Sequence, residues 1–212
     1  MSTTDHWDDV YRSRPEEDLG WYEPVPSTLP DVLEFAHDRS ARIVDVGAGA
    51  SRLADELIDR GYEAVTLVDV SDAAFDRVRQ RLAARGLPEP TIVVADATGL
   101  DLGGEIDLWH DRAVFHFLTD ADARVAYVDA ADRSVGPGGA VVVAAFAPDG
   151  PESCAGLPVE RYDADRLTAE FSRRFASAGC RHHRGTDTDG DVRPYTICRF
   201  RKRGDRDVRS AP

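Results

Sequence analysis

Three aspartates occupy equivalent places in a repeating pattern of apolar segments and polar turns. Asp45 lies in the stretch IVDVGAGASRL, two residues before the first of the paired glycines Gly47 and Gly49. Asp69 ends the next apolar segment, and Asp96 follows the third one, in VVADA. A carboxylate at the end of a buried strand accepts hydrogen bonds from ligand hydroxyl or amino groups. The pattern therefore predicts a binding site for a small molecule that offers such donors.

The glycine turn favours one kind of ligand. A dinucleotide-binding turn would carry a glycine where this chain has Arg52, and the turn has no Walker-type lysine. An acid two residues before Gly47 suits a ligand that carries a cation and no phosphate, such as S-adenosylmethionine. Asp69 would then accept hydrogen bonds from the ribose hydroxyls and Asp96 from the adenine amino group. Each aspartate, taken alone, is equally well explained as a helix cap.

A second group of polar side chains follows the fourth apolar segment, in LWHDRAVFHF. His110, Asp111, Arg112 and His116 lie at or just after the end of this strand, beside the predicted ligand. We expect them to form the reacting centre, where they would orient an acceptor or hold a proton. Two structural alternatives remain open at this point: a local ion pair between Asp111 and Arg112, and simple packing of His116.

The amino-terminal segment is polar but rich in aromatic residues. The stretch DHWDDVYRSRPEEDLGWYEP contains Trp7, Tyr11, Trp21 and Tyr22. Aromatic faces attract cations, so we expect Trp7, Tyr11 and Trp21 to cover the sulfonium and its methyl group as a lid. A helix that starts near Ser27 would tether this lid. Core packing is the alternative for one or two of these rings.

These residues need a scaffold in which strands and helices alternate. Strand-like segments occur at 41–46, 64–70, 91–95, 106–110 and 139–147, and helical patterns lie between them. The helices have stop signals at Gly61 and Gly86, and Thr119 is a candidate cap. Such alternation predicts a doubly wound α/β domain with a parallel sheet. After position 158 we expect a helix from Leu167 through Phe175 to Gly179 and then two strands, around 182 and 195–200.

Composition limits the classes of partner and compartment. The 212 residues suit a single domain, and a net charge of −13 argues against binding to nucleic acid. The longest apolar run, 140–147, is too short to span a membrane. Cys154, Cys180 and Cys198 are too few for a disulfide framework, and their spacing predicts no metal site. We therefore expect a cytoplasmic protein.

The quoted stretches resemble those of class I S-adenosylmethionine-dependent methyltransferases, over nearly the whole chain. The stretch VGAGASRLADELIDRGYEAVTLVDVSDAAFDRV is similar to the group of lysine methyltransferases that modify elongation factor 1A and citrate synthase, and HDRAVFHFLTD also resembles thiopurine methyltransferases. Ser51 stands where the family often has a third glycine. The resemblance implies a Rossmann-like seven-stranded sheet. It also implies which residues bind the cofactor: the turn with Asp45, Gly47, Ala48 and Gly49 at the methionine part, Asp69 and Val70 at the ribose, and Asp96 and Ala97 at the adenine edge.

The resemblance also implies an organisation and a function. We expect a lid and tethering helix at 1–40, a methyltransferase domain at 41–202 and a disordered tail at 203–212. The expected activity is methyl transfer to a small molecule or to a protein side chain. A small molecule is favoured, because the chain has no long insertion that would dock a protein. The alternative is a domain that keeps the fold and binds the cofactor without catalysis.

Overall fold

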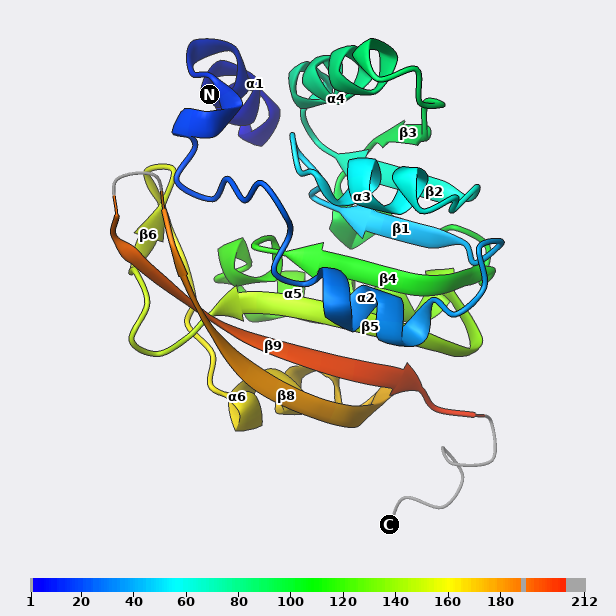
Figure 1. Ribbon diagram of the computed structural model, residues 1–212. Coiled ribbons are helices and arrows are strands. Elements are labelled where there is room, and N and C mark those ends of the chain that lie inside the picture. The colour runs from blue at the N-terminus through cyan, green and yellow to red at the C-terminus, as the bar shows by residue number, and fades with distance from the viewer. Residues whose placement is uncertain (1, 188–189, 205–212) are drawn as a thin grey trace.

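The computed structural model describes residues 2–187 and 190–204, and its centre is a seven-stranded sheet with the order β3-β2-β1-β4-β5-β9-β8 (Figure 1). The first five strands run parallel and β9 runs antiparallel to both of its neighbours. Their bounds are β1 Ile43–Val46, β2 Val65–Asp69, β3 Thr91–Val94, β4 Ile106–Arg112, β5 Val135–Phe146, β8 Phe175–Thr186 and β9 Val192–Lys202. The predicted α/β fold with a seven-stranded sheet is confirmed.

Helices cover both faces of the sheet. On one face lie α2 Leu29–Phe35, α3 Leu53–Asp59 and α4 Asp72–Ala84, and on the other lie α5 Ala121–Ser134 and α6 Ala164–Phe171. Neighbouring residues of one strand point to opposite faces, so Ile43 packs with the first group and Val44 with the second. A strand covered on both faces needs apolar residues at successive positions, as the run from Ala140 to Phe146 in β5 shows.

Several element boundaries differ from the sequence-based prediction: β4 ends at Arg112 and not at 110, and β5 begins at Val135 and not at 139. Two further differences concern helix ends. The amino terminus of α5 is capped by Asp120, whose carboxylate accepts from the backbone N–H groups of Asp122 and Ala123, so the cap is not Thr119. The last predicted helix ends at Phe171, and Phe175 is the first residue of β8. The spacing of Leu167, Phe171 and Phe175 suggested one continuous helix because both the helix end and the strand start bury an aromatic ring in the same cluster.

The amino-terminal segment packs beside α4 and across the carboxyl ends of the strands (Figure 1). Its helix α1, Thr3–Ser13, begins with a capping box between Ser2 and Asp5. The short 3-10 turn η1, Glu16–Asp18, follows it. Tyr11 and Leu19 form a small apolar cluster with Ala50 and Ala74, separate from the two clusters on the sheet faces. Of the predicted tail, residues 205–212 lie outside the described part of the chain.

The cysteines depart from the sequence-based expectation. Cys180 and Cys198 lie opposite each other in β8 and β9 and form a disulfide, whereas Cys154 is free and buried. A cross-strand pair cannot be recognised from the sequence spacing of the two residues alone. Since this pair is oxidised, the cysteines no longer argue for a reducing compartment, and the cytoplasmic location stays a prediction.

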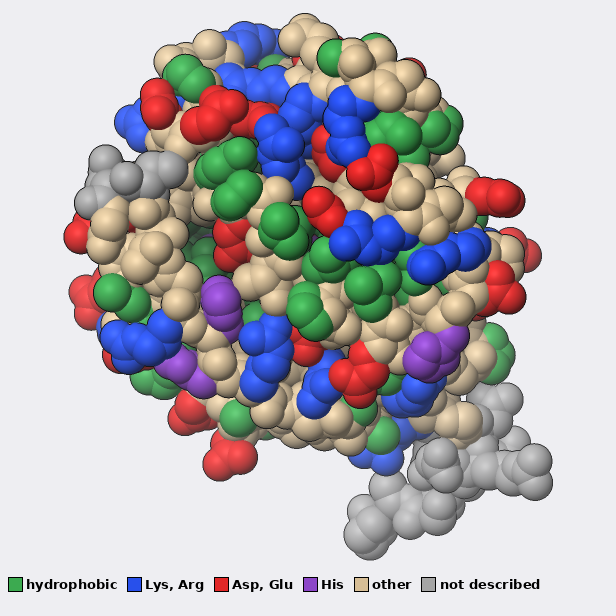
Figure 2. All heavy atoms as spheres, viewed as in Figure 1, with side chains coloured by type: hydrophobic (Ala, Val, Ile, Leu, Met, Phe, Trp, Pro, Cys, Tyr) green, Lys and Arg blue, Asp and Glu red, His purple; other side chains and the backbone are tan. Residues whose placement is uncertain are grey.

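None of the helices in the described part of the chain is long and apolar enough to cross a lipid bilayer. Charged residues of both signs cover the face shown in Figure 2, where arginines lie next to acids. Two ion pairs join α2 to the last two strands: Arg181 pairs with Asp31, and Arg199 with Glu34.

Candidate functional site

A cavity of about 350 Å³ opens at the carboxyl ends of β1, β2, β3 and β4, where ligands bind in open α/β sheets. The strand ends form its floor, α1 and the loop at Trp21 cover one side, and a short hairpin of β6 Ser153–Cys154 and β7 Leu157–Pro158 closes another. Of the predicted cofactor residues, those that line it are Trp7, Tyr11, Trp21, Gly47, Asp69, Val70, Asp96 and Ala97. Asp45, Ala48 and Gly49 do not line it.

The paired glycines are required by the packing of this chain's own side chains. Gly47 and Gly49 have φ of +60° and +51°, a backbone conformation that residues with a Cβ atom rarely adopt. A Cβ at Gly47 would collide with Val114, and a Cβ at Gly49 would collide with the hydroxyl of Tyr11. The turn thus meets α1 and the loop after β4 at van der Waals distance. The close approach that the sequence indicated is present, and in this structure it is made by protein atoms.

Asp69 is a buried carboxylate at the edge of the cavity. Its Oδ2 accepts from the backbone N–H of Gly49 at 2.8 Å and its Oδ1 from that of Ser71 at 2.9 Å. Burial raises the pKa of Asp69 to about 6, although these backbone donors oppose the shift. Each carboxylate oxygen has a second lone pair, so both can still accept from a ligand.

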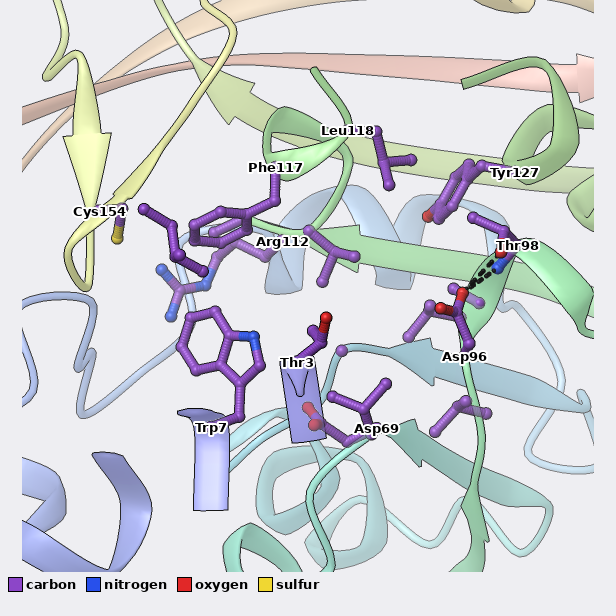
Figure 3. Close-up of a pocket in the computed structure, with 18 of the residues that line it drawn as sticks. Thr3, Trp7, Asp69, Asp96, Thr98, Arg112, Phe117, Leu118, Tyr127 and Cys154 are labelled. Atoms are coloured by element: carbon purple, nitrogen blue, oxygen red, sulfur yellow. Dashed lines mark hydrogen bonds between the residues drawn. The ribbon is translucent and has the colours of Figure 1, made fainter. Parts of the chain in front are cut away.

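Asp96 serves as a cap and also faces the cavity. Its Oδ1 accepts from the backbone N–H and the hydroxyl of Thr98, at 2.8 and 2.7 Å, and so starts the 3-10 turn η2, Ala97–Gly99 (Figure 3). The cap interpretation and the ligand interpretation are compatible at this position, because Asp96 is exposed and belongs to the cavity wall.

Aromatic rings from distant parts of the sequence meet over the cavity. The ring centroid of Trp7 lies 5.8 Å from that of Trp21 and 5.3 Å from that of Phe117, both in edge-on contacts. Tyr11 packs against the same Trp21 ring at 6.3 Å. The same rings line the cavity and pack against one another. The geometry is therefore compatible with a lid and with core packing. The lid function stays a prediction.

Ion pairs and hydrogen bonds hold the amino-terminal segment on the domain. Arg81 of α4 binds Glu16, Asp55 and the carbonyl oxygens of Ala50 and Ser51. A second contact is made by Ser71, whose hydroxyl donates to the carboxylate of Asp8 in α1 at 2.6 Å. A third contact is made by Arg77 of α4, whose guanidinium donates to the carbonyl oxygens of Tyr11 and Arg14. Arg81 therefore connects the glycine turn and the segment that covers it.

Asp45 and His110 face each other inside the domain, beneath the glycine turn. Asp45 Oδ1 lies 2.7 Å from His110 Nδ1, and His110 Nε2 lies 2.8 Å from the hydroxyl of Thr28 at the start of α2. All three side chains are buried, and Asp45 Oδ2 has no hydrogen-bond partner among the described residues. The structure thus places His110 in a buried chain that joins α2, β4 and β1, away from the cavity lining.

Two other predicted reacting residues are also behind the cavity wall. Asp111 is fully buried and accepts from the N–H groups of Val114 and Phe115 and from the Tyr127 hydroxyl; burial raises its pKa to about 6. His116 is fully buried, and burial together with the charge of Arg112 lowers its pKa to about 3. Neither side chain lines the cavity, and the partners of Asp111 differ from the local ion pair with Arg112 that the sequence allowed.

Arg112 is the one member of the predicted reacting group that lines the cavity. Its guanidinium donates to the carbonyl oxygen of Trp21 at 2.6 Å, and the Glu23 carboxylate lies 3.6 Å away. Arg112 therefore links β4 to the loop that carries Trp21.

Sequence reasoning missed several residues of the wall: Thr3, Thr98, Val114, Phe117, Leu118, Tyr127, Cys154, Leu157 and Pro158. One signal was available for the hairpin. Ala155 and Gly156, with φ of +51° and +79°, form a two-residue turn between β6 and β7. Only Gly156 carries the usual signal of such a turn, because the first position is typically Asn, Asp or Gly and not Ala. Tyr127 carried no signal, because its position on α5 reads as an ordinary core residue.

Comparison with known proteins agrees with this geometry. Residues 43–139 match a family described as methyltransferase domain. Over 98 residues the chain is 31% identical to the eEF1A lysine and N-terminal methyltransferase of Danio rerio, covering 46% of the chain and only 14% of that protein. Over 196 residues it is 27% identical to methyltransferase srdJ of Neurospora crassa, covering 90% of the chain and 79% of that protein.

Solved structures show the same fold. One comes from work on the conversion of a disulfide bond into a thioacetal group during echinomycin biosynthesis; it has a TM-score of 0.75 and 26% identity, over 94% of this chain and 93% of the other. Further methyltransferases with this fold hold S-adenosylhomocysteine, at 19% and 15% identity. Likeness at that level concerns the fold alone.

Proposed function

Because this chain belongs to the class I S-adenosylmethionine-dependent methyltransferases, we propose that it transfers the methyl group of S-adenosylmethionine to a small-molecule acceptor. The observation that carries the proposal is the cavity itself. Asp96 lies on one side of it, Trp7, Phe117 and Arg112 lie on the other side, and Asp69 lies between them (Figure 3).

The residues present fit the cofactor. The buried Asp69 carboxylate retains lone pairs for two ribose hydroxyls, and Asp96 with Ala97 lies at the adjoining wall for adenine. Trp7 and Tyr11 present aromatic rings, which suit a sulfonium cation. When bound, the cofactor supplies a methyl group on an activated leaving group. The chain's own residues would therefore mainly orient the acceptor and exclude water.

A small acceptor is supported by the enclosure of the cavity. α1, the loop at Trp21 and the β6–β7 hairpin surround it, which leaves little access for a folded protein. The chain covers only 14% of the eEF1A relative, so that protein's substrate carries little weight here. Charge argues in the same direction against nucleic acid, because 39 acidic residues oppose 26 basic ones.

Calorimetry tests the cofactor assignment. We expect S-adenosylmethionine and S-adenosylhomocysteine to bind and NAD not to bind. Asp69→Ala should weaken binding by about 1.5–3 kcal/mol, the usual worth of hydrogen bonds to a charged group. Asp72→Ala is the matched control, since Asp72 is an exposed acid nearby that does not line the cavity. Tight NAD binding without sulfonium binding would overturn the proposal.

Catalysis is tested separately from binding. The protein should form S-adenosylhomocysteine when it is incubated with cofactor and a panel of small acceptors. Normal cofactor binding without turnover on any small-molecule or protein acceptor would favour the non-catalytic alternative.

A further inference from the structure

Arg112 is a cation at the inner wall of the cavity, at the end opposite to Asp96. Figure 3 places it beside Trp7, Phe117 and Cys154, while Asp96 and Thr98 lie on the other side of the space. Its side chain is only 9% exposed. Charges of opposite sign therefore lie in different parts of the cavity: carboxylates where we expect the nucleoside, and a guanidinium where we expect the acceptor.

The ion pair of Arg112 is longer than that of Arg81. Its carboxylate neighbour, Glu23, lies 3.6 Å away, while the same carboxylate accepts from the backbone N–H and hydroxyl of Ser27 at 2.7 and 3.0 Å. By contrast, Arg81 binds the buried Asp55 directly at 2.7 Å. Burial lowers the pKa of Arg112, but the charges of neighbouring acids, Glu23 first among them, outweigh it and raise the pKa, so the guanidinium stays charged. An anion that enters the cavity would add a second, closer partner to this largely buried cation.

Hydrogen-bonding capacity is also left over. A guanidinium has five N–H donors, and the hydrogen bond found for Arg112 among the described residues goes to the carbonyl oxygen of Trp21. The neighbouring His116 does not add positive charge, because its pKa is lowered to about 3. The remaining donors of Arg112 therefore match a planar oxyanion, which guanidinium groups bind with two parallel hydrogen bonds.

The walls around this cation are aromatic or apolar. Trp7, Trp21, Phe117, Leu157 and Pro158 contribute rings and aliphatic surface and no charge. They suit a flat, largely apolar body. An acceptor that binds as a protonated amine would meet the like charge of Arg112 at this end, which disfavours a cationic acceptor.

We propose that the acceptor is an aromatic acid, and that Arg112 binds its carboxylate and thereby selects it. This inference deepens the proposed function and rests on it. Arg112 is a specificity residue in this account, since it holds the acceptor and takes no part in the transfer of the methyl group.

The test compares three probes that share one phenol ring: 4-hydroxybenzoate, 4-hydroxybenzamide and tyramine. Each is titrated onto protein saturated with S-adenosylhomocysteine, by calorimetry and by the fluorescence of the cavity tryptophans. We expect the carboxylate to bind at least about tenfold more tightly than the amide, and the amine to bind most weakly. Arg112→Gln should abolish the preference, and Arg112→Lys should keep part of it. Arg184→Gln, at an exposed arginine that pairs with Asp149 and does not line the cavity, should leave it unchanged.

Three outcomes would overturn the inference: equal binding of the three probes, tighter binding of the amine, or no binding of the carboxylate at millimolar concentration. A fourth concerns the cofactor, whose methionine part also carries a carboxylate. If Arg112→Gln weakened S-adenosylhomocysteine binding about tenfold and left probe selectivity intact, Arg112 would hold the cofactor instead. Failure of the wild type to bind S-adenosylhomocysteine would count against the proposed function, whereas normal binding without anion preference would count against this inference alone.

Discussion

At the scale of single residues, the acids of the site differ in how their surroundings control their protonation. Asp69 is the acid that combines burial with a place on the cavity wall, and burial raises its pKa to about 6. A carboxyl whose pKa is raised on folding contributes most stability below its ordinary pKa of 3.8, and this contribution is lost as pH rises through 6. At neutral pH the protein therefore keeps a charged Asp69 at a cost in stability, and a ligand that donates to it offsets this cost.

This titration predicts the pH dependence of cofactor binding. The ionised form of Asp69 is the one that accepts from both ribose hydroxyls, so affinity should be constant above about pH 7 and fall below about pH 6, towards tenfold per pH unit. Calorimetric titration of S-adenosylhomocysteine between about pH 5 and 8 measures this. In Asp69→Asn the affinity should be lower and flat over the same range. A profile in the variant that matches the wild type would assign the titration to another group, such as Asp111.

His110 gives a second prediction at this scale. Replacing it with alanine leaves the Asp45 carboxylate and the Thr28 hydroxyl buried without their partner. We expect His110→Ala to lower the free energy of unfolding by about 3 kcal/mol in denaturant titrations. His37→Ala, at an exposed position, is the control and should change little. A His110→Ala protein that is as stable as the wild type but inactive would restore the catalytic interpretation of His110.

At the scale of elements, the amino-terminal segment is the part whose role is most separable from the fold. Its apolar residues form their own small cluster, and polar contacts from Arg77 and Arg81 hold it on α4. The two main cores lie on the faces of the sheet and are built from α2 onward. Of this segment, Trp21 also packs against the edge of one main core, so removing the segment uncovers only the margin of that core.

Deletion of residues 1–22 should leave a folded domain with native far-ultraviolet circular dichroism, but it should abolish methyl transfer, because α1 and the loop at Trp21 form one side of the cavity. Hydrogen exchange of the full-length protein should show stronger protection of residues 5–24 when S-adenosylhomocysteine is bound. Turnover by the truncated protein at the full-length rate would return Trp7, Tyr11 and Trp21 to a packing role.

At the scale of the whole molecule, the dominant feature is an excess of negative charge. The net charge of −13 is spread over a surface on which many acids already pair with arginines. Exposed ion pairs contribute little to the free energy of unfolding, so screening by salt removes little stability. Long-range repulsion among the excess acids, by contrast, opposes the compact state.

Salt should therefore stabilise the protein. Between about 0.1 and 1 M KCl the Debye length falls from roughly 10 to 3 Å, and we expect the thermal midpoint to rise by roughly 2–4 °C, or about 1 kcal/mol. Thermal unfolding followed by circular dichroism at several KCl concentrations measures this. A midpoint that falls with salt would mean that the ion pairs, such as those around Arg81, outweigh the net repulsion.

The amino-acid sequence by itself determined the alternation of strands and helices from β1 onward, the glycine turn, and the acids Asp69 and Asp96 at the ends of β2 and β3. It predicted neither helix α1 nor the β6–β7 hairpin. The features that the sequence determined are local, because apolar periodicity, helix stop signals and a glycine turn each depend on a few neighbouring residues. The parallel arrangement of the strands then brings their carboxyl ends to one edge of the sheet. Only the tertiary structure decided which side chains around that edge reach the cavity. In the stretch from His110 to His116, a strand end and the left-handed residue Ala113, with φ of +72°, direct Arg112 to the cavity and place His110, Asp111 and His116 behind its wall. The Cys180–Cys198 disulfide and the place of Tyr127 likewise depend on pairing and packing between distant segments, which no local pattern encodes.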